Sequence, residues 1–526
     1  MAIDSDEVVR EGLSSVTKGT LFLLVSTLVL VGLTFVSRVL IVRSISPTDW
    51  SAFSFGLTLA GVLAALGSLG LPNAVARSLP YASSDDERRT IVRATLWIGG
   101  ASTVVASVLL FVFAVPIGDT LGSTEIGIGL QYFSIGVGAS IFGGLIASIF
   151  QGYEDVAPNA MFIQIVNPAL FVAFLAIARV LPPSGLDYRA SLLAYALSNV
   201  AMLAALVLYL VRRLPKRLPS GPRAPATLPR FLRFAAPLFI VTVMVSVMGA
   251  GDTLILGIYH PLDVGSYTVS LTLARLLQIG ITAAAYIFLP VASKFLRQNE
   301  PTSIATTYTT VTKWMILVSL PLFLLFFFLP SSSLEFVYGP TYSTIVLPLQ
   351  IVVAGAFLTT VLGPAPTAQV AFGQTQLLAV NAVVAGLVDV VVAFALVPTY
   401  TYVGAAIAWG VANATYTALS AVQLAARSRV HPFHRHFVLP LLATALPVGL
   451  ALTVLHPTFT FGWKLATLEL PGIGLGIAAL FVVLVVATRS VDEGDRLLLE
   501  AVERLVGRPL PFVRRLGRYA LRRRSL

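Results

Sequence analysis

The sequence contains no cysteine and few charged residues. Of its 526 residues, 57% are hydrophobic and 11% are charged. Without cysteine the chain can form no disulfide scaffold, no thiolate metal site and no thiol nucleophile. Soluble domains carry about 25% charged residues, so a chain this poor in charge cannot cover a water-exposed surface of its size. Its hydrophobicity also excludes intrinsic disorder, and the class that remains is a polytopic membrane protein.

Motifs for nucleotide-driven or covalent chemistry are lacking as well. No GxxxxGK[ST] phosphate loop is present, and no water-facing segment combines a catalytic triad or paired carboxylates. His431 and His434 have a spacing that a metal could use, but no nearby carboxylate completes a ligand set. The net charge of +11 does not indicate nucleic-acid binding, because the bases fall between apolar runs. We therefore expect no enzyme activity, no cofactor, no metal site and no nucleic-acid partner.

Long apolar runs, by contrast, are abundant. A helix needs about 20 apolar residues to cross roughly 30 Å of hydrocarbon, and its backbone groups must be paired within the segment. Fourteen runs meet this requirement: 20–42, 50–71, 92–115, 128–150, 156–180, 189–211, 232–257, 264–289, 305–329, 343–363, 376–397, 402–425, 437–456 and 470–488. The predicted fold class is an all-α polytopic membrane protein with about fourteen transmembrane helices.

The positions of lysine and arginine predict the orientation of these helices. With a cytoplasmic N-terminus, 29 of the 35 basic residues fall in cytoplasmic segments, as the positive-inside rule requires. The acidic start has no basic n-region and no cleavage site, so the first apolar run is interpreted as a retained span and not as a signal peptide. We predict a multi-pass protein of the cell membrane with both termini in the cytoplasm.

A basic, Pro-rich linker divides the spans into six and eight. The predicted organisation is a cytoplasmic N-terminus (1–19), an N-lobe (20–211), the linker (212–231), a C-lobe (232–425), two further helices (426–489) and a basic amphipathic cytoplasmic tail (490–526). The tail is expected to lie on the inner leaflet. A docking surface for a glycosyltransferase partner is the alternative for this tail.

An internal repeat relates the two lobes. An offset of 214 residues pairs "LIVRSISPTDWSAFSFGLTLA" (40–60) with "LILGIYHPLDVGSYTVSLTLA" (254–274), so that Pro47 corresponds to Pro261 and Asp49 to Asp263. The same offset pairs residues 191–199 with 405–413. Six intervening spans keep the repeats in one orientation, so the axis that relates them runs along the membrane normal. Parallel repeats of this kind build transporters whose binding site lies between the halves.

The repeated motifs resemble a known family. "GDTLILGIYHPLDVGSYTVSLTLARLLQ" (251–278) is similar to the seventh and eighth helices of Wzx-like oligosaccharide flippases, polysaccharide biosynthesis proteins of the multidrug/oligosaccharidyl-lipid/polysaccharide (MOP) exporter superfamily. Segments 37–55, 67–77, 150–160 and 371–382 resemble other turns of that family. The resemblance implies two six-helix lobes in a V around a hydrophilic cavity, with two extra C-terminal helices. It also implies that a lipid-linked oligosaccharide is moved by alternating access, for assembly of cell-surface polysaccharide or glycoprotein glycans.

Ionisable residues within the spans are the candidate site residues, because charge at membrane depth is costly and faces a cavity or a partner. Arg275 lies near the middle of its span and is interpreted as a substrate or gating residue, with an ion pair to Asp252 as the alternative. Asp389, in the middle of another span, is expected either to pair with an arginine or to carry a coupling proton or Na⁺. Arg38 occupies the position equivalent to Asp252 in the repeat. The two are predicted to form an outer gate, unless Arg38 reaches the headgroups instead.

The expected substrate and its driving force follow from these residues. A polyprenyl-phosphate-linked oligosaccharide carries phosphate or diphosphate, which guanidinium binds bidentately, so Arg38 and Arg275 are expected to bind it. Asn73 and Gln278 are candidate sugar contacts, with helix packing as the alternative. The further candidates of this kind are Gln131, Tyr132, Gln164, Asn167, Tyr286 and Asn381. Membrane lipids are further partners, and H⁺, Na⁺ or the membrane potential would drive transport.

Two other function classes stay open. A cation-coupled multidrug (MATE-like) exporter would prefer an acidic cavity, so Asp252 and Asp389 favour it while Arg38 and Arg275 count against it. A membrane-embedded glycosyltransferase or polymerase would need a large outer loop carrying catalytic residues. The longest predicted outer connections have about a dozen residues, which weighs against such an enzyme.

Overall fold

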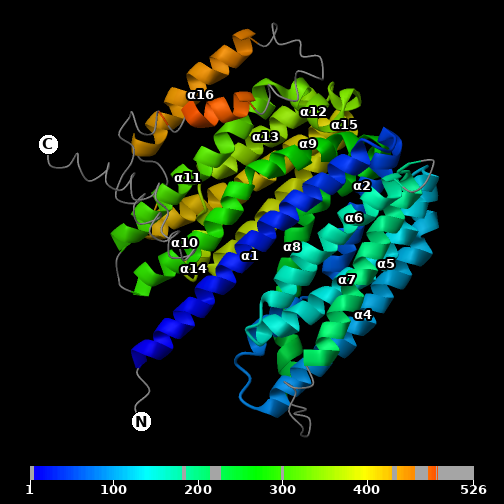
Figure 1. The fold of residues 1–526 in the computed structure, drawn as a ribbon, viewed down its shortest axis with the longest axis vertical. Coiled ribbons are helices and arrows are strands. Elements are labelled where there is room, and N and C mark those ends of the chain that lie inside the picture. Colours follow the sequence, from blue (N-terminus) through cyan, green and yellow to red (C-terminus); the bar gives the residue numbers. More distant parts are fainter. Residues whose placement is uncertain are drawn as a thin grey trace, which may run out of the picture. The chain divides into compact units, whose positions relative to one another are not determined.

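A computed structural model describes residues 5–180, 185–213, 227–297, 301–428, 430, 435–455, 472–480 and 483. Every element in these ranges is helical (Figure 1). The elements are α1 (Ser5–Val42), α2 (Pro47–Gly67), α3 (Leu71–Ser78), α4 (Asp85–Thr120), α5 (Thr124–Gly152), η1 (Asn159–Val166), α6 (Asn167–Val180), α7 (Tyr188–Arg213), α8 (Thr227–Tyr259), η2 (Pro261–Asp263), α9 (Val264–Leu277), α10 (Ile279–Arg297), α11 (Pro301–Phe328), α12 (Pro330–Tyr338), η3 (Pro340–Tyr342), α13 (Val346–Val361), α14 (Ala365–Ala371), α15 (Thr375–Ser428) and α16 (Arg435–Leu455).

The predicted spans coincide with helices over most of the described chain. Ten helices, or eleven if one bent pair counts as a single span, are long and apolar enough to cross a membrane. The predicted thirteenth span falls on α16, whereas only residues 472–480 and 483 of the fourteenth are described. Residues 214–226 of the linker, His431, His434 and the tail after residue 489 lie outside the described residues. The chain is thus an all-helical, multi-pass membrane protein.

One span predicted to be continuous is broken. Residues 264–289 form α9 and α10, which meet at Gln278 and are bent by 41° from one another. The apolar pattern continues through this point, and hydropathy alone therefore did not predict the bend. A second irregularity is η1, a π-helix of eight residues inside the predicted span 156–180.

The predicted boundary between the spans 376–397 and 402–425 falls on a break within α15. Thr401 has a positive φ (φ 48°, ψ −128°), and this non-helical conformation interrupts the helix. A Cβ on Gly404 would lie 2.6 Å from the backbone carbon of Leu396, so the chain after Thr401 packs closely on the chain before it. The 54 residues of α15 are long enough for two spans of about 20 residues each.

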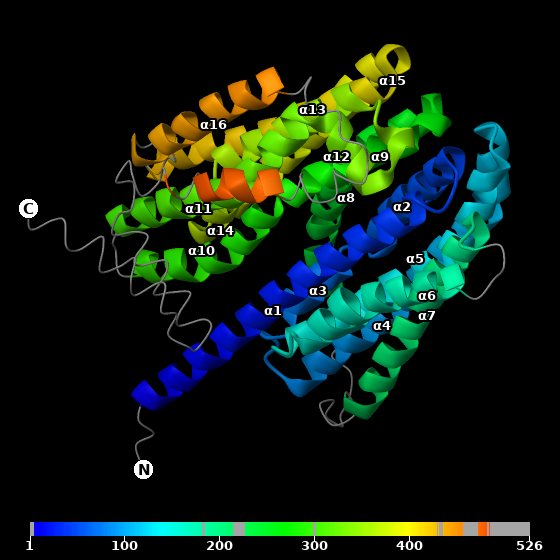
Figure 2. The same ribbon diagram turned by 45° about the horizontal axis from the view of Figure 1, so that its top comes forward.

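The first of two compact units comprises residues 25–268 and 389–405. Its central helix is α5, against which α2, α4 and α7 pack (Figures 1 and 2). Gly129 and Gly136 on α5 lie against Tyr188 and Tyr195 on α7, where a Cβ would overlap the tyrosine side chains. Both pairs recur every seven residues, so they lie on one face of each helix. Small residues at such a seam let helices pack closely in lipid, where apolar character alone does not drive them together.

Residues 214 positions apart bond to each other within this unit, where α2 meets the start of α9. The Gly265 N–H donates to Ser51 Oγ at 3.0 Å, and Thr268 Oγ1 donates to Ser54 Oγ at 3.1 Å. Next to these bonds, Trp50 Nε1 donates to the carbonyl of Gly265, which is 215 positions away, at 3.2 Å. Residues that the 214-residue offset makes equivalent therefore contact one another at this place.

The second unit comprises the described parts of residues 1–24, 269–388 and 406–526. Here α11 packs against α10, α13 and α16. Its core includes the fully buried Phe288 and Tyr308, whose rings meet edge to face at 5.9 Å. The Tyr308 hydroxyl donates to the Leu362 carbonyl at 2.6 Å, which gives this buried polar group the partner that it needs.

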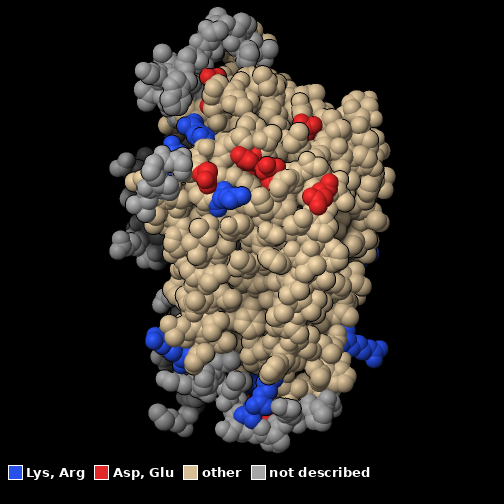
Figure 3. Space-filling model, turned by 90° about the vertical axis from the view of Figure 1, so that its right-hand side faces the viewer, with Lys and Arg blue, Asp and Glu red and all other residues tan. Residues whose placement is uncertain are grey.

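Charged side chains lie toward the two ends of the face shown in Figure 3, and a band without them lies between. Acidic side chains gather toward one end, with some lysine or arginine side chains among them, whereas the other end is marked by lysine and arginine. A hydrocarbon layer about 30 Å thick would occupy the uncharged band, and the basic end is the one expected to face the cytoplasm.

Candidate functional site

Two acidic side chains, 137 residues apart in sequence, meet inside the first unit. Asp252 on α8 and Asp389 on α15 both have 0% exposure. The backbone N–H of Asp252 donates to Oδ2 of Asp389 at 3.2 Å. Gly251 permits this approach, because a Cβ at that position would lie 2.8 Å from the same oxygen. The fold therefore brings the Asp389 carboxylate against the backbone of Asp252, within two helices that are candidate membrane spans.

Hydroxyl groups satisfy one carboxylate better than the other. The Tyr267 hydroxyl donates to Oδ2 of Asp252, and Thr253 Oγ1 donates to its Oδ1 at 3.3 Å. Oδ1 of Asp389 is buried and has no hydrogen-bond partner among the described residues. A buried acceptor without a partner costs about 1–3 kcal/mol, and more when it is charged. Asp389 therefore offers an open carboxylate oxygen to a proton or to a small cation such as Na⁺.

Arg38 and Asn73 belong to the same unit as the carboxylate pair. Arg38 lies on α1 and is half-buried, while Asn73 lies on α3 and is exposed. Nδ2 of Asn73 donates to Thr242 Oγ1 on α8 at 3.5 Å. The gate formed by Arg38 with Asp252 and the sugar contact of Asn73 stay predictions.

Arg275 and Gln278 belong to the other unit. Arg275 is in the last turn of α9, and its side chain is exposed. Gln278 is the half-buried residue at the break before α10, where its N–H donates to the Arg275 carbonyl at 3.1 Å. The guanidinium thus lies next to a bend and not in the middle of a straight span. The ion pair of Arg275 with Asp252 stays a prediction.

Two of the further sugar-contact candidates are engaged in helix packing. Asn381 is 1% exposed, and its Nδ2 donates to Ser420 Oγ at 3.1 Å and to Gln423 Oε1 at 2.9 Å. Oε1 of Gln164 accepts a hydrogen bond from Ser26 at 2.7 Å. These amides satisfy one another or nearby hydroxyls across helices, as polar groups in membrane bundles do. We attribute both to packing and not to substrate binding.

Tyr267 is the residue of the carboxylate site that sequence reasoning missed. It is fully buried and donates to Asp252. Its equivalent in the 214-residue repeat is Phe53, so the second repeat carries a hydroxyl at a core position where the first repeat has none. That difference between equivalent residues was the available signal.

Comparisons with known proteins agree with this architecture. The sequence profile of polysaccharide biosynthesis proteins matches residues 16–296. The fold is similar to that of the lipid II flippase MurJ in an inward closed conformation, with 14% identity, a TM-score of 0.69 and coverage of 87% of this chain and 97% of that one.

A multidrug resistance MATE family transporter of the MOP superfamily, in its inward-facing conformation, is also similar, with 14% identity, a TM-score of 0.60 and coverage of 78% and 98%. A MOP superfamily transporter from Pyrococcus furiosus gives 13% identity, a TM-score of 0.51 and coverage of 79% and 95%. No curated protein matches the sequence. At these identities the structural likeness concerns the fold.

Proposed function

The chain belongs to the polysaccharide biosynthesis protein family, and from this premise we propose that it is a flippase for a lipid-linked oligosaccharide. Its cargo would carry phosphate or diphosphate on a polyprenyl chain and pass from the cytoplasmic to the outer leaflet by alternating access. The observation that carries the proposal is the family match over residues 16–296, supported by a MurJ-like fold. The transported glycan would then be used for cell-surface polysaccharide or glycoprotein glycan assembly.

The proposed topology has fourteen spans with both termini in the cytoplasm, arranged as two six-helix lobes in a V plus two C-terminal helices. The ten or eleven described candidate spans and the basic end seen in Figure 3 support it. Arg38 and Arg275 are assigned to the lipid phosphate, because a guanidinium offers paired donors to its oxygens. Asn73 and Gln278 are assigned to the sugar.

The carboxylate pair would couple transport to an ion. Asp252 and Asp389 lie together without exposure, and one Asp389 oxygen has no described partner. Ionisable groups buried in membrane helices mark proton relays and ion sites. We assign this pair to H⁺ or Na⁺, whose binding would bias the protein toward one of its conformations.

The second candidate is a cation-coupled multidrug exporter. The buried acidic pair and the similarity to a MATE family fold favour it. The two functions differ in the role of the arginines. In the flippase Arg38 and Arg275 would bind the lipid phosphate, whereas in the exporter they would repel a cationic drug. Transport of an organic cation that does not depend on either arginine would identify this function.

The flippase function is tested by deleting the gene and locating the lipid-linked oligosaccharide. We expect it to accumulate on the cytoplasmic face, as measured with a membrane-impermeant sugar-modifying reagent on oriented vesicles. Restoring the wild-type gene should clear the accumulated lipid. Absence of accumulation in the deletion strain would contradict the flippase function.

Arg275→Ala is expected to lower the initial flipping rate about tenfold or more, because a charged hydrogen bond to phosphate is lost. Arg275→Lys should retain part of the rate, since it keeps the charge but not the paired donors. Arg189→Ala, which removes an exposed arginine from the start of α7, is the matched control and should leave the rate unchanged. Equal rates for Arg275→Ala and Arg189→Ala would remove Arg275 from the site.

Gly251→Ala is expected to weaken ion coupling without unfolding the protein. The new methyl group would meet the flexible end of the Asp389 side chain, 2.8 Å away, and displace it from the Asp252 N–H. Gly249→Ala on the same helix meets nothing within 4 Å, and both variants gain about 1 kcal/mol of helix propensity. We expect only Gly251→Ala to raise the ion concentration that gives half-maximal transport. An equal effect of the two would contradict the role of Gly251.

A further inference from the structure

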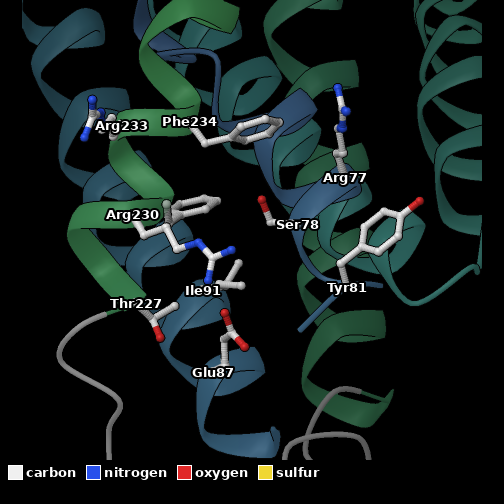
Figure 4. Close-up of a pocket in the computed structure, with 10 residues that line it drawn as sticks. Arg77, Ser78, Tyr81, Glu87, Ile91, Thr227, Arg230, Arg233 and Phe234 are labelled. Atoms are coloured by element: carbon white, nitrogen blue, oxygen red, sulfur yellow. The ribbon is translucent and has the colours of Figure 1, made fainter. Parts of the chain in front are cut away.

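A cavity of about 420 Å³ lies where the end of α3, the start of α4 and the start of α8 meet. All three segments belong to the first unit. Figure 4 shows the Arg230 guanidinium pointing into this space, with Arg77 and Tyr81 on the opposite side. Arg233 lines the same cavity one turn further along α8. The volume is within the 300–1,000 Å³ typical of small-ligand pockets.

The lining carries excess positive charge. Glu87 is the one acidic residue among the described residues that line the cavity, against three arginines. One of its carboxylate oxygens, Oε2, already accepts the Ser83 N–H at 2.8 Å, while the Glu87 N–H donates to Ser84 Oγ at 3.2 Å. This capping box fixes the start of α4. The adjoining linker residues 214–226 include no aspartate or glutamate, so that segment cannot neutralise the arginines.

An aromatic ring orients one of the guanidiniums. The Arg77 guanidinium carbon lies 5.4 Å from the centroid of the Phe234 ring, a distance at which a cation and an aromatic face attract. A cation–π contact uses none of the guanidinium N–H donors for hydrogen bonding, so these donors stay available to an anion. Arg77 and Arg230 line opposite sides of the cavity, and each guanidinium offers paired N–H donors of the kind that an oxyanion accepts.

Hydropathy places the cavity at the level of lipid headgroups. Arg230 lies two residues before the apolar run 232–257, and Glu87 five residues before the run 92–115. Tyr81 is 82% exposed, and exposed aromatic residues of this kind mark the membrane–water interface. An oxyanion present in quantity at that level is the phosphate of a lipid headgroup.

We propose that this cavity binds the phosphate of an anionic membrane lipid through Arg77 and Arg230, with Arg233 adding charge at its margin. Bound there, the headgroup ties the start of α8 to α3 and α4. The proposal does not depend on the cargo that is transported, because none of the residues assigned to the cargo lines this cavity.

The test uses the full chain purified in detergent and native mass spectrometry with defined lipids. We expect wild type to retain phosphatidylglycerol about tenfold better than phosphatidylcholine. The double variant Arg77→Gln/Arg230→Gln should lose this preference, because two charged donors to phosphate are removed. The control Arg93→Gln/Arg212→Gln removes two exposed arginines outside the cavity and should keep the preference.

A gain-of-binding variant guards against misfolding as the explanation. Glu87→Gln removes the acidic lining charge yet can still form the capping box, so we expect it to strengthen phosphatidylglycerol binding severalfold. Equal retention of the two lipids by wild type, or equal losses in the two double variants, would overturn the proposal. If inorganic phosphate displaced phosphatidylglycerol at the same concentration as the lipid, the site would bind free phosphate, and the assignment to a lipid headgroup would be wrong.

Discussion

Replacing Gly70 with alanine is expected to destabilise the protein strongly, because the added methyl group has no room. Gly70 precedes α3 with a left-handed backbone (φ 67°), and a Cβ there would lie 2.5 Å from the Phe239 nitrogen and 2.9 Å from the Ala235 carbonyl oxygen. Both atoms belong to the backbone of α8, so the overlap can be relieved only by shifting that helix away from α3. The left-handed conformation costs about 1–2 kcal/mol for alanine, and the overlap adds about 1–3 kcal/mol or more.

The control for this variant is Gly122→Ala. Gly122 has a nearly identical backbone (φ 66°) but nothing within 4 Å of an added Cβ, so it should lose only the conformational part, about 1–2 kcal/mol. Thermal unfolding in detergent, followed by retention on size exclusion, measures the difference. Equal losses of stability would mean that α3 and α8 separate at little cost, against the close approach seen at Gly70.

Replacing Asp389 with asparagine is expected to abolish ion coupling while leaving the protein at least as stable as wild type. Asparagine keeps the shape and an acceptor for the Asp252 N–H, but it cannot exchange a proton or neutralise a cation. Because Oδ1 of Asp389 has no described hydrogen-bond partner, removing its charge relieves a buried cost of about 1 kcal/mol or more. Stability and activity should therefore move in opposite directions, as they do at functional sites.

The measurement is transport in proteoliposomes with and without a Na⁺ or proton gradient. Wild type should respond to one of the two gradients, and Asp389→Asn and Asp252→Asn should respond to neither. Asp119→Asn, which removes an exposed carboxylate at the end of α4, should keep the wild-type response. A gradient response that survives in both Asp389→Asn and Asp252→Asn would assign ion coupling to another part of the chain.

Hydropathy predicted the helices because every span in lipid needs about 20 apolar residues whose backbone groups are paired within the segment. The predicted segments fall on α1, α2, α4, α5, α7, α8, α11 and α16 with shifts of up to seven residues at their ends, except that α1 begins 15 residues before its predicted start. It also predicted the reversal near Thr401, where the apolar run is interrupted. Hydropathy did not predict the bend at Gln278, because the bend depends on packing around that residue and not on how apolar the segment is.

The sequence identifies the two acidic residues of the carboxylate site one by one, but it does not predict that they meet in the fold. Asp252 and Asp389 are conspicuous because each is an acid within an apolar run. Their meeting depends on the path of 137 residues between them and on the missing side chain of Gly251, neither of which periodicity reveals. Arg77 and Arg230 were predicted only as markers of orientation, since the cavity that they line forms when α3 and α8 come together.

The bonds between residues 214 positions apart bear on how the two repeats could diverge. At the axis of a homodimer each residue faces its own copy, so one mutation changes both sides at once. In this single chain, Ser51 faces Gly265 as acceptor to donor, and Ser54 faces Thr268. Each side can therefore mutate separately. The same independence lets an arginine at position 38 correspond to an aspartate at 252, a chemical asymmetry that two identical subunits could not encode.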